Sequence, residues 1–102
     1  MPAELGNLVN LRWLELANNC LTGEIPATLG NLSYLWYLDL SKNRLTGTLP
    51  EELSNIPKLR HFNLSHNYLK GYVPASFTKL VTLCVDGQYW EACKRDDGSY
   101  YF

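Results

Sequence analysis

The chain has 102 residues, which is enough for one small domain. Its 9 basic and 10 acidic side chains leave a formal net charge of −1. This charge disfavours a nucleic-acid partner, because proteins that bind nucleic acid by neutralising its phosphates usually carry a basic excess. No apolar run approaches the roughly 18 residues of a membrane-spanning helix, so no membrane span is expected. The Met-Pro-Ala-Glu start opens neither a basic nor a long apolar region, so no secretory signal is expected in this sequence.

A 16-residue pattern occurs three times along the chain. It reads LRWLELANNCLTGEIP from Leu11, LWYLDLSKNRLTGTLP from Leu35 and LRHFNLSHNYLKGYVP from Leu59. The copies start 24 residues apart with no insertion, so leucine, asparagine, glycine and proline recur in fixed columns. A period of about 20–29 residues with the pattern L-x-x-L-x-L-x-x-N-x-L is the signature of a leucine-rich repeat.

Each copy is expected to form one coil of a solenoid. In the middle copy, the alternation from Leu38 to Leu40 predicts a short strand, and the turn-forming residues from Ser41 to Pro50 predict a bend and an irregular return. A single coil leaves its apolar sides open, so neighbouring coils must cover them. The inward residues predicted for the middle coil are Leu35, Leu38, Leu40, Leu45, Leu49, Leu53 and Ile56.

The two ends of the array differ from its middle. The chain starts within a unit, since Pro2 aligns with Pro26 one period later. A fourth unit would begin at Leu83, but Asp86 and Gln88 occupy the places of its next leucines. We therefore predict a leucine-rich-repeat array over residues 1–83, with a partial unit at 2–10 and full units from 11, 35 and 59, followed by a C-terminal cap over residues 84–102.

An asparagine follows each predicted strand, at Asn19, Asn43 and Asn67. There the backbone turns into the core, where its N–H and C=O groups lose both strand partners and water. An inward asparagine offers two donors and an acceptor, so each should bond to the turning backbone of its own coil and of the next coil. We predict that these residues form a structural ladder without a functional role.

The three cysteines are Cys20, Cys84 and Cys93, and their odd number leaves at least one thiol free or paired between chains. Cys20 lies in the bend after the first strand, in the column of Arg44 and Tyr68. No further His or Cys stands at ligand spacing near the other two, so no metal site is expected. That pair forms either a local Cys84–Cys93 disulfide or two unpaired thiols, and the disulfide is favoured because a terminal cap needs a staple.

The segments LTGEIP, LTGTLP and LKGYVP, the first two followed by LGNL and LSNI, resemble the plant-type extracellular subclass of leucine-rich repeats. The subclass includes the ectodomains of plant receptor-like kinases and the polygalacturonase-inhibiting proteins. The resemblance covers residues 2–83. It implies an α/β fold, a right-handed solenoid with parallel strands on the concave side and short 3₁₀ turns behind. It also implies an extracellular location, recognition of a peptide, protein or cell-wall enzyme, and often a paired-cysteine cap.

Strand positions that alternate with the buried leucines should point outward on the concave face. They form an aromatic row, a largely acidic row and a flanking row that is basic with an aromatic centre. Exposed Trp, Tyr and Arg are enriched at binding hot spots, so we expect a protein- or peptide-binding surface here. The simpler alternative is that these residues are ordinary exposed strand residues that favour strand pairing. The predicted binding residues are Arg12, Trp13, Glu15, Trp36, Tyr37, Asp39, Arg60 and His61.

An enzyme is a weaker alternative. Asp39, His61 and either Ser41 or Ser65 could be drawn as a hydrolytic triad. They would lie on a flat, open face, and the sequence indicates neither a pocket nor oxyanion donors. We therefore expect no catalytic residue and no cofactor.

The N-terminal end provides the second functional hypothesis. Leu5, Leu8, Leu11, Leu14 and Leu16 should form the core of the first coil, and no cap precedes them. The first strand would also present an unpaired edge. An apolar face with a free edge favours self-association or marks a piece of a longer protein, so we expect either a homo-oligomer formed through this end or a structural fragment.

Overall fold

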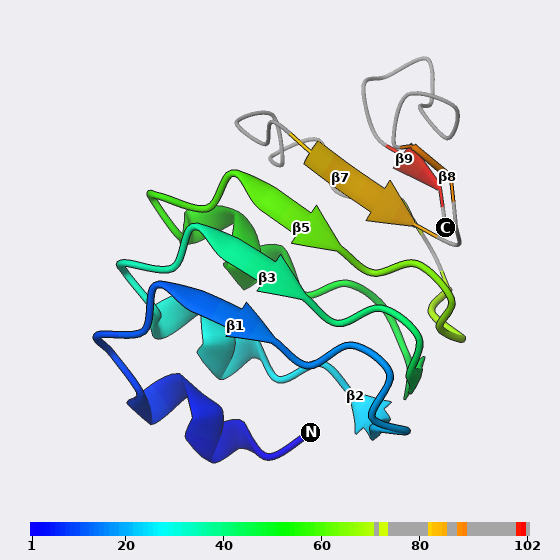
Figure 1. Cartoon of the computed structure of the whole chain (residues 1–102), viewed down its shortest axis with the longest axis horizontal. Helices are drawn as coiled ribbons and strands as arrows, with labels where there is room; N and C mark the ends of the chain where they lie inside the picture. Colours follow the sequence, from blue (N-terminus) through cyan, green and yellow to red (C-terminus); the bar gives the residue numbers. More distant parts are fainter. Residues whose placement is uncertain (71, 74–81, 86–87, 90–99, 102) are drawn as a thin grey trace.

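The structure of the chain, a computed structural model, describes residues 1–70, 72–73, 82–85, 88–89 and 100–101, with side-chain surroundings for residues 1–70. Each full coil contains a three-residue strand, and the coils are joined on the opposite side by short 3₁₀ helices (Figure 1). In chain order the elements are η1 (Ala3–Asn7), β1 (Trp13–Glu15), β2 (Thr22–Glu24), η2 (Ala27–Asn31), β3 (Tyr37–Asp39), β4 (Arg44–Thr46), η3 (Glu51–Asn55), β5 (His61–Asn63), β6 (Tyr72–Val73), β7 (Thr82–Val85), β8 (Gln88–Tyr89) and β9 (Tyr100–Tyr101).

The main sheet has the strand order β1-β3-β5-β7-β8, and its first four strands are parallel. Trp13 lies opposite Tyr37, and Tyr37 lies opposite His61, so the first three strands keep the 24-residue period of the sequence. Each proline before a 3₁₀ helix has extended backbone, with φ of −72° at Pro2 and Pro26, which suits the fixed φ of proline. The predicted solenoid of parallel strands and 3₁₀ turns is confirmed.

The fourth parallel strand corrects the predicted start of the fourth unit. Phe62 lies opposite Leu83 and Asn63 lies opposite Cys84, so β7 follows β5 after 21 residues rather than 24. Leu83 therefore takes the second leucine place of its unit, not the first, and the matching sequence LVTLCV starts at Leu80. The strand pattern thus continues through Val85, whereas the boundary between array and cap stays a prediction.

Two further pairings involve the last part of the chain. β8 pairs antiparallel with β7, and β9 pairs antiparallel with β6. The predicted Cys84–Cys93 disulfide stays a prediction, because Cys93 lies outside the described residues. Cys20 is a free, exposed thiol.

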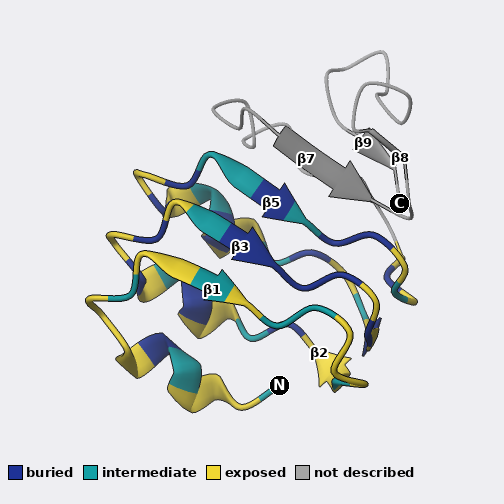
Figure 2. Ribbon diagram, viewed as in Figure 1, coloured by how far each residue is buried: buried dark blue, intermediate teal, exposed yellow. Residues whose placement is uncertain are grey.

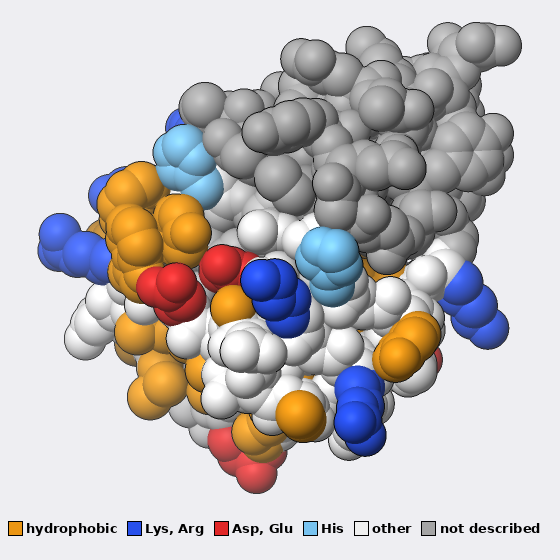
Figure 3. Space-filling model, turned by 45° about the vertical axis from the view of Figure 1, so that its right-hand side comes forward, with side chains coloured by type: hydrophobic (Ala, Val, Ile, Leu, Met, Phe, Trp, Pro, Cys, Tyr) orange, Lys and Arg blue, Asp and Glu red, His pale blue; other side chains and the backbone are white. Residues whose placement is uncertain are grey.

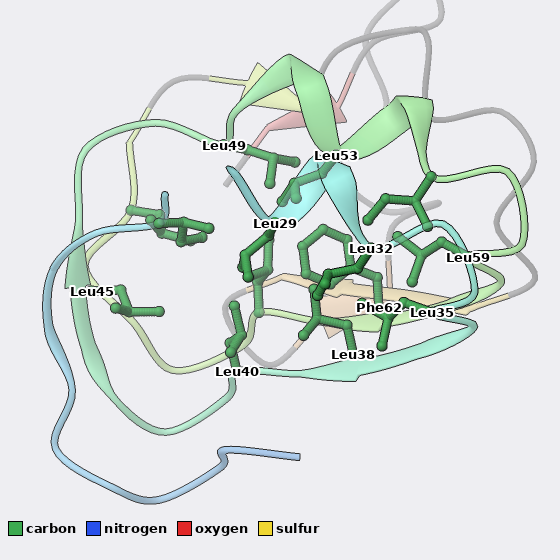
Figure 4. Packing of buried hydrophobic residues seen from close by; sticks show 14 residues of the cluster. Leu29, Leu32, Leu35, Leu38, Leu40, Leu45, Leu49, Leu53, Leu59 and Phe62 are labelled. Carbon is green, nitrogen blue, oxygen red and sulfur yellow. The ribbon is translucent and has the colours of Figure 1, made fainter. Parts of the chain in front are cut away.

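The apolar core lies between the strands and the 3₁₀ helices. Figure 4 shows Leu29, Leu32 and Leu53, from the 3₁₀ side, directed toward Leu38 and Phe62 on the strand side. The prediction for the middle coil is confirmed, because all seven of its inward residues are buried: Leu35, Leu38, Leu40, Leu45, Leu49, Leu53 and Ile56.

The first coil is less well covered than the middle coil. Figure 2 shows exposed residues along β1 and β2 and buried residues in β3 and β5. Leu5, Leu11, Leu14 and Leu16 pack against the core and are only partly buried. Leu8, which was predicted to belong to this core, is 50% exposed because the coil has no neighbour on that side in the described structure.

Asn43 makes the ladder contacts that its column predicts, with a correction in their direction. Its Nδ2 donates to the carbonyl oxygens of Leu16 and Leu40 at 2.9 and 3.0 Å. Its Oδ1 accepts from the backbone N–H groups of Asn19 and Leu21 at 3.0 and 2.9 Å. The bonds to Asn19, Leu21 and Leu16 reach the preceding coil, not the next one, because the N–H groups of the earlier bend point toward the later coil, and the bond to Leu40 stays within the coil of Asn43.

Asn67 repeats this arrangement one coil later. Its Nδ2 donates to the carbonyl of Leu40 in the preceding coil and to that of Leu64 in its own coil, at 2.9 and 3.0 Å. Its Oδ1 accepts from the N–H of Leu45 at 3.0 Å. Asn19 stands first in the column, and its side-chain amide donates to the carbonyl of Ala17 in its own coil. The ladder therefore joins the second and third full coils, through Asn43 and Asn67, each to the coil before it.

The 3₁₀ helices also stack closely, and two glycines make this possible. A Cβ on Gly6 would lie 2.5 Å from the carbonyl oxygen of Thr28, and one on Gly30 would lie 2.7 Å from that of Glu52. The hydroxyl of Thr28 also donates to the carbonyl of Ala3 at 2.7 Å. On the convex side, successive 3₁₀ helices thus approach one another at backbone distance, and the Thr28 hydrogen bond joins the first two.

Candidate functional site

Four ring side chains gather at the start of the strands on the concave face, and we call them the aromatic cluster: Trp13, Trp36, Tyr37 and His61. Trp13, Tyr37 and His61 are the first residues of β1, β3 and β5 and lie opposite one another in register. Because neighbouring strands are about 4.8 Å apart, the fixed 24-residue period brings these rings into contact. Trp36 precedes β3 and joins the cluster from the flanking column.

The rings of the cluster pack against one another in defined geometries. Trp13 and Tyr37 stack with centroids 3.8 Å apart and planes 8° from parallel. Trp36 meets Trp13 edge-on at 5.1 Å and His61 edge-on at 5.5 Å. Trp13 and Trp36 nevertheless stay 47% and 40% exposed, and Figure 3 shows hydrophobic side chains gathered on this surface beside a histidine and acidic side chains. The cluster is therefore preorganised and open to solvent.

A basic edge borders the cluster on the side where the strands begin. The Arg12 guanidinium lies 6.0 Å from the ring centre of Tyr34, and the Lys58 ammonium lies 5.0 Å from it. Tyr34 is 45% exposed, and the two cations are held on its ring by cation–π attraction. The prediction named Arg12 but missed Tyr34 and Lys58. A signal was present, because Asn10, Tyr34 and Lys58 form their own 24-residue column.

Arg60 lies at the same edge, with part of its donor capacity already used. Its guanidinium donates to the carbonyl oxygens of Pro57 and Leu59 at 3.1 and 2.9 Å. These bonds fix the side chain at the entry to β5. Arg60 thus contributes a positioned positive charge to the predicted surface.

The acidic row differs from its prediction. Glu15 is exposed, and one of its carboxylate oxygens accepts from the indole N–H of Trp13 at 3.3 Å. Asp39, opposite Glu15, is only 8% exposed, because its carboxylate turns inward and accepts from the N–H of Ser41 at 2.9 Å. Asn63 accepts the matching bond from Ser65 at 3.0 Å. The expectation that the Asp39 side chain is exposed is therefore wrong, because its carboxylate holds the bend, whereas its part in binding stays a prediction.

The serines of the hydrolytic alternative are also used by the fold. Ser41 and Ser65 are buried, at 4% and 6% exposure. The hydroxyl of Ser65 donates to the side chain of Asn63 at 2.8 Å. Neither serine thus presents an open hydroxyl beside His61. Within the described part of the chain, no group of three His, Cys, Asp or Glu side chains could hold a metal ion.

A second surface lies at the N-terminal end of the stack. Leu8 and Val9 are 50% and 52% exposed, and a shallow depression is lined by residues 7–11. β1 is the edge strand of the main sheet and has β3 as its partner. Among the described residues, no helix is long and apolar enough to cross a membrane.

Comparison with known families supports the repeat assignment. Two family models described as leucine-rich repeat match residues 3–45 and 58–80, which together cover about two thirds of the chain. Among curated proteins, no sequence matches this one.

Several solved structures of plant proteins are similar over most of the chain. The matched chain in the crystal structure of PEPR1–AtPEP1 is 42% identical to this chain, with a TM-score of 0.79. The match covers 83% of this chain and 12% of the other. The ectodomain of the Arabidopsis thaliana receptor kinase GASSHO1/SCHENGEN3, in complex with CASPARIAN STRIP INTEGRITY FACTOR 2, is 42% identical with a TM-score of 0.75, covering 83% and 10%. The plant peptide hormone receptor RGFR1, in complex with RGF2, is 35% identical with a TM-score of 0.74, covering 83% and 14%.

This chain therefore spans only about a tenth of the length of the proteins that it resembles. Their identity to it confirms the plant receptor resemblance that the L-T-G-x-I/L-P segments indicate. The chain belongs to the leucine-rich-repeat family, and its structural neighbours are the ectodomains of plant receptor kinases.

Proposed function

We propose that the chain is a non-enzymatic recognition module that binds a peptide or protein through the aromatic cluster and its charged borders. One observation carries this proposal: rings from three successive coils pack together while Trp13 and Trp36 stay 47% and 40% exposed. Large exposed aromatics that are already fixed in place lose little conformational freedom on binding, which is the property of a hot spot. The cluster spans about two strand spacings, a width that suits a short peptide segment.

The similar structures support a peptide as the ligand. RGFR1 is a peptide hormone receptor and is bound to RGF2, and PEPR1 is bound to AtPEP1. This chain matches about a tenth of each protein, and we extend to it only the chemical class of their ligands, a peptide. By the same resemblance we infer an extracellular location, since GASSHO1/SCHENGEN3 was solved as the ectodomain of a membrane receptor kinase.

A peptide-display experiment tests the recognition function. Random peptides are selected on the wild-type chain, and the affinity of the recovered peptides is then measured on two variants. The double variant Trp36→Ala with Tyr37→Ala should weaken binding at least about tenfold, because hot-spot truncation usually costs 2 kcal/mol or more. Tyr68→Ala is the matched control, since Tyr68 is 70% exposed in the bend away from the cluster. Recovered peptides that bind the double variant as tightly as the wild type would refute the proposal.

The exposed end of the stack favours a second candidate function, self-association. Leu8 and Val9 lie on this end together with the partly buried leucines of the first coil, so a second copy would cover apolar surface there. Sedimentation of the wild type should show a mass that rises with concentration, and Leu8→Asp with Val9→Asp should keep the chain monomeric. A wild-type chain that is monomeric at every concentration contradicts self-association. The Trp36→Ala/Tyr37→Ala variant should associate like the wild type.

A further inference from the structure

Trp13 has one ring face that the cluster leaves uncovered. Its other face stacks on Tyr37 at 3.8 Å, and Trp36 meets the ring edge-on. In the described structure β1 pairs with β3 alone, and no described ring stacks on the outer face of Trp13. The ring is therefore held rigidly from one side while its other face is available to a ligand.

A carboxylate stands beside this open face. The indole N–H of Trp13 donates to Glu15 at 3.3 Å, which fixes the carboxylate near the edge of the ring. Glu15 is exposed, and no basic side chain in the described part of the chain pairs with it. An ionised carboxylate has about four acceptor positions, so this single bond leaves most of its capacity for a ligand.

The combination of an aromatic face and an adjacent carboxylate suits one side chain in particular. A guanidinium is planar, so it can stack on an indole and donate several N–H bonds to a carboxylate at the ring edge. An ammonium is a compact point charge without a plane, so it would gain the charge attraction but not the stacking. The open face of Trp13 and the carboxylate of Glu15 are therefore most complementary to arginine.

We propose that Trp13 and Glu15 form a subsite for an arginine side chain of the peptide ligand, which rests on the recognition function proposed above. The charges around the subsite give the ligand a direction. Arg12 and Lys58 lie on the ring of Tyr34 at the edge where the strands begin, whereas Glu15 ends β1, so the two cations repel a cation and attract an anion at the edge away from Glu15. A bound segment thus places its arginine toward Glu15 and any acidic group toward Tyr34.

Titration with small arginine analogues tests the subsite without knowledge of the natural ligand. The probes are Nα-acetyl-arginine amide and its uncharged isostere Nα-acetyl-citrulline amide, and the readout is the indole N–H resonance of Trp13 in a ¹H–¹⁵N spectrum. The resonance is assigned by its loss in Trp13→Phe. We expect a saturable shift with the arginine probe and about two- to fivefold weaker binding of the citrulline probe, as one exposed cation–π contact implies. Equal affinity for the two probes, or no saturable shift, would overturn the proposal.

Three variants separate the subsite from general charge effects. Glu15→Gln should reduce the preference for the arginine probe, because the carboxylate charge is lost while the ring of Trp13 stays, whereas Glu51→Gln, an exposed carboxylate in η3, should leave it unchanged. Arg12→Gln should tighten binding of the arginine probe, because it removes a repelling charge. A preference in Glu15→Gln as large as in the wild type would refute the subsite. Display-selected peptides that bind through Trp36 and Tyr37 but lack an arginine requirement would refute this subsite alone and leave the recognition function intact.

Discussion

The first coil (residues 11–34) and the middle coil (residues 35–58) have closely similar sequences but different surroundings. Leu38 is completely buried between two coils, whereas Leu14, its partner across the sheet, is only partly buried. Asn43 exchanges hydrogen bonds with the preceding coil through both ends of its amide, whereas Asn19 makes one side-chain bond to its own coil. The same residue type therefore stabilises the fold to different degrees, and its place in the stack decides how much.

Truncation of Leu38 and of its partner Leu14 should give the largest difference between the coils in the free energy of unfolding. Leu38→Ala should lower the free energy of unfolding by about 2–5 kcal/mol, because it opens a cavity in a fully covered core. Leu14→Ala should cost clearly less, since its side chain is partly solvated and the edge can relax. Urea denaturation followed by circular dichroism measures both. Equal losses in the two variants would mean that the first coil is covered as well as the middle coil.

Removal of the ladder amides should give a smaller difference of the same sign. Asn43→Ala leaves two N–H groups of the preceding bend without their acceptor and the Leu16 carbonyl without its amide donor, whereas the carbonyls of Leu40 and Ser41 keep a second donor, so the cost should be about 1–3 kcal/mol. Asn19→Ala removes one exposed bond and should cost less than about 1 kcal/mol. The same denaturation experiment provides the comparison. A loss for Asn19→Ala as large as that for Asn43→Ala would argue against a ladder that reaches backward.

The repeat itself could be predicted because each architectural residue has one physical reason to recur. Leu35 and Leu38 recur at the places that face the core, and Asn43 recurs where the backbone turns away from its strand partners. A period without insertions transfers such assignments from one coil to the next, so the parallel register of the first three strands follows directly.

The burial of Asp39 could not be read from strand alternation alone. Glu15 and Asp39 occupy the same strand place and carry the same charge, so alternation predicts the same exposure for both. The shorter aspartate side chain reaches the N–H two residues later and closes a local turn, as Asn63 also does, whereas glutamate is one methylene too long for that geometry. An Asp or Asn followed at the second residue by Ser was the available signal.

The register of β7 was missed for a different reason. Leu80 and Leu83 both fit the first leucine place, and the 24-residue period favours Leu83. The asparagine and glycine columns that fix the earlier units do not continue after Val85, so nothing in the sequence corrects the choice. Backbone pairing with β5 resolves it, because Leu83 lies opposite Phe62.

Glycine substitution in the bend should give the smallest difference in the free energy of unfolding between the coils, and Cys20→Gly and Arg44→Gly should change that free energy in opposite directions. Cys20 adopts a left-handed backbone with φ of 55°, whereas Arg44 lies in β4 and is not among the described residues with positive φ. Cys20→Gly relieves a conformation that costs L-residues about 1–2 kcal/mol, partly offset by a more flexible unfolded chain, so the free energy of unfolding should stay equal or rise by up to about 1 kcal/mol. Arg44→Gly should lower it by about 0.5–1 kcal/mol, because glycine only loosens a strand there.

Cys20→Ala is the control, since it removes the thiol but keeps the strain and should not stabilise the chain. Denaturation under reducing conditions measures all three. Losses of similar size in Cys20→Gly and Arg44→Gly would show that the first bend carries no more strain than the middle one.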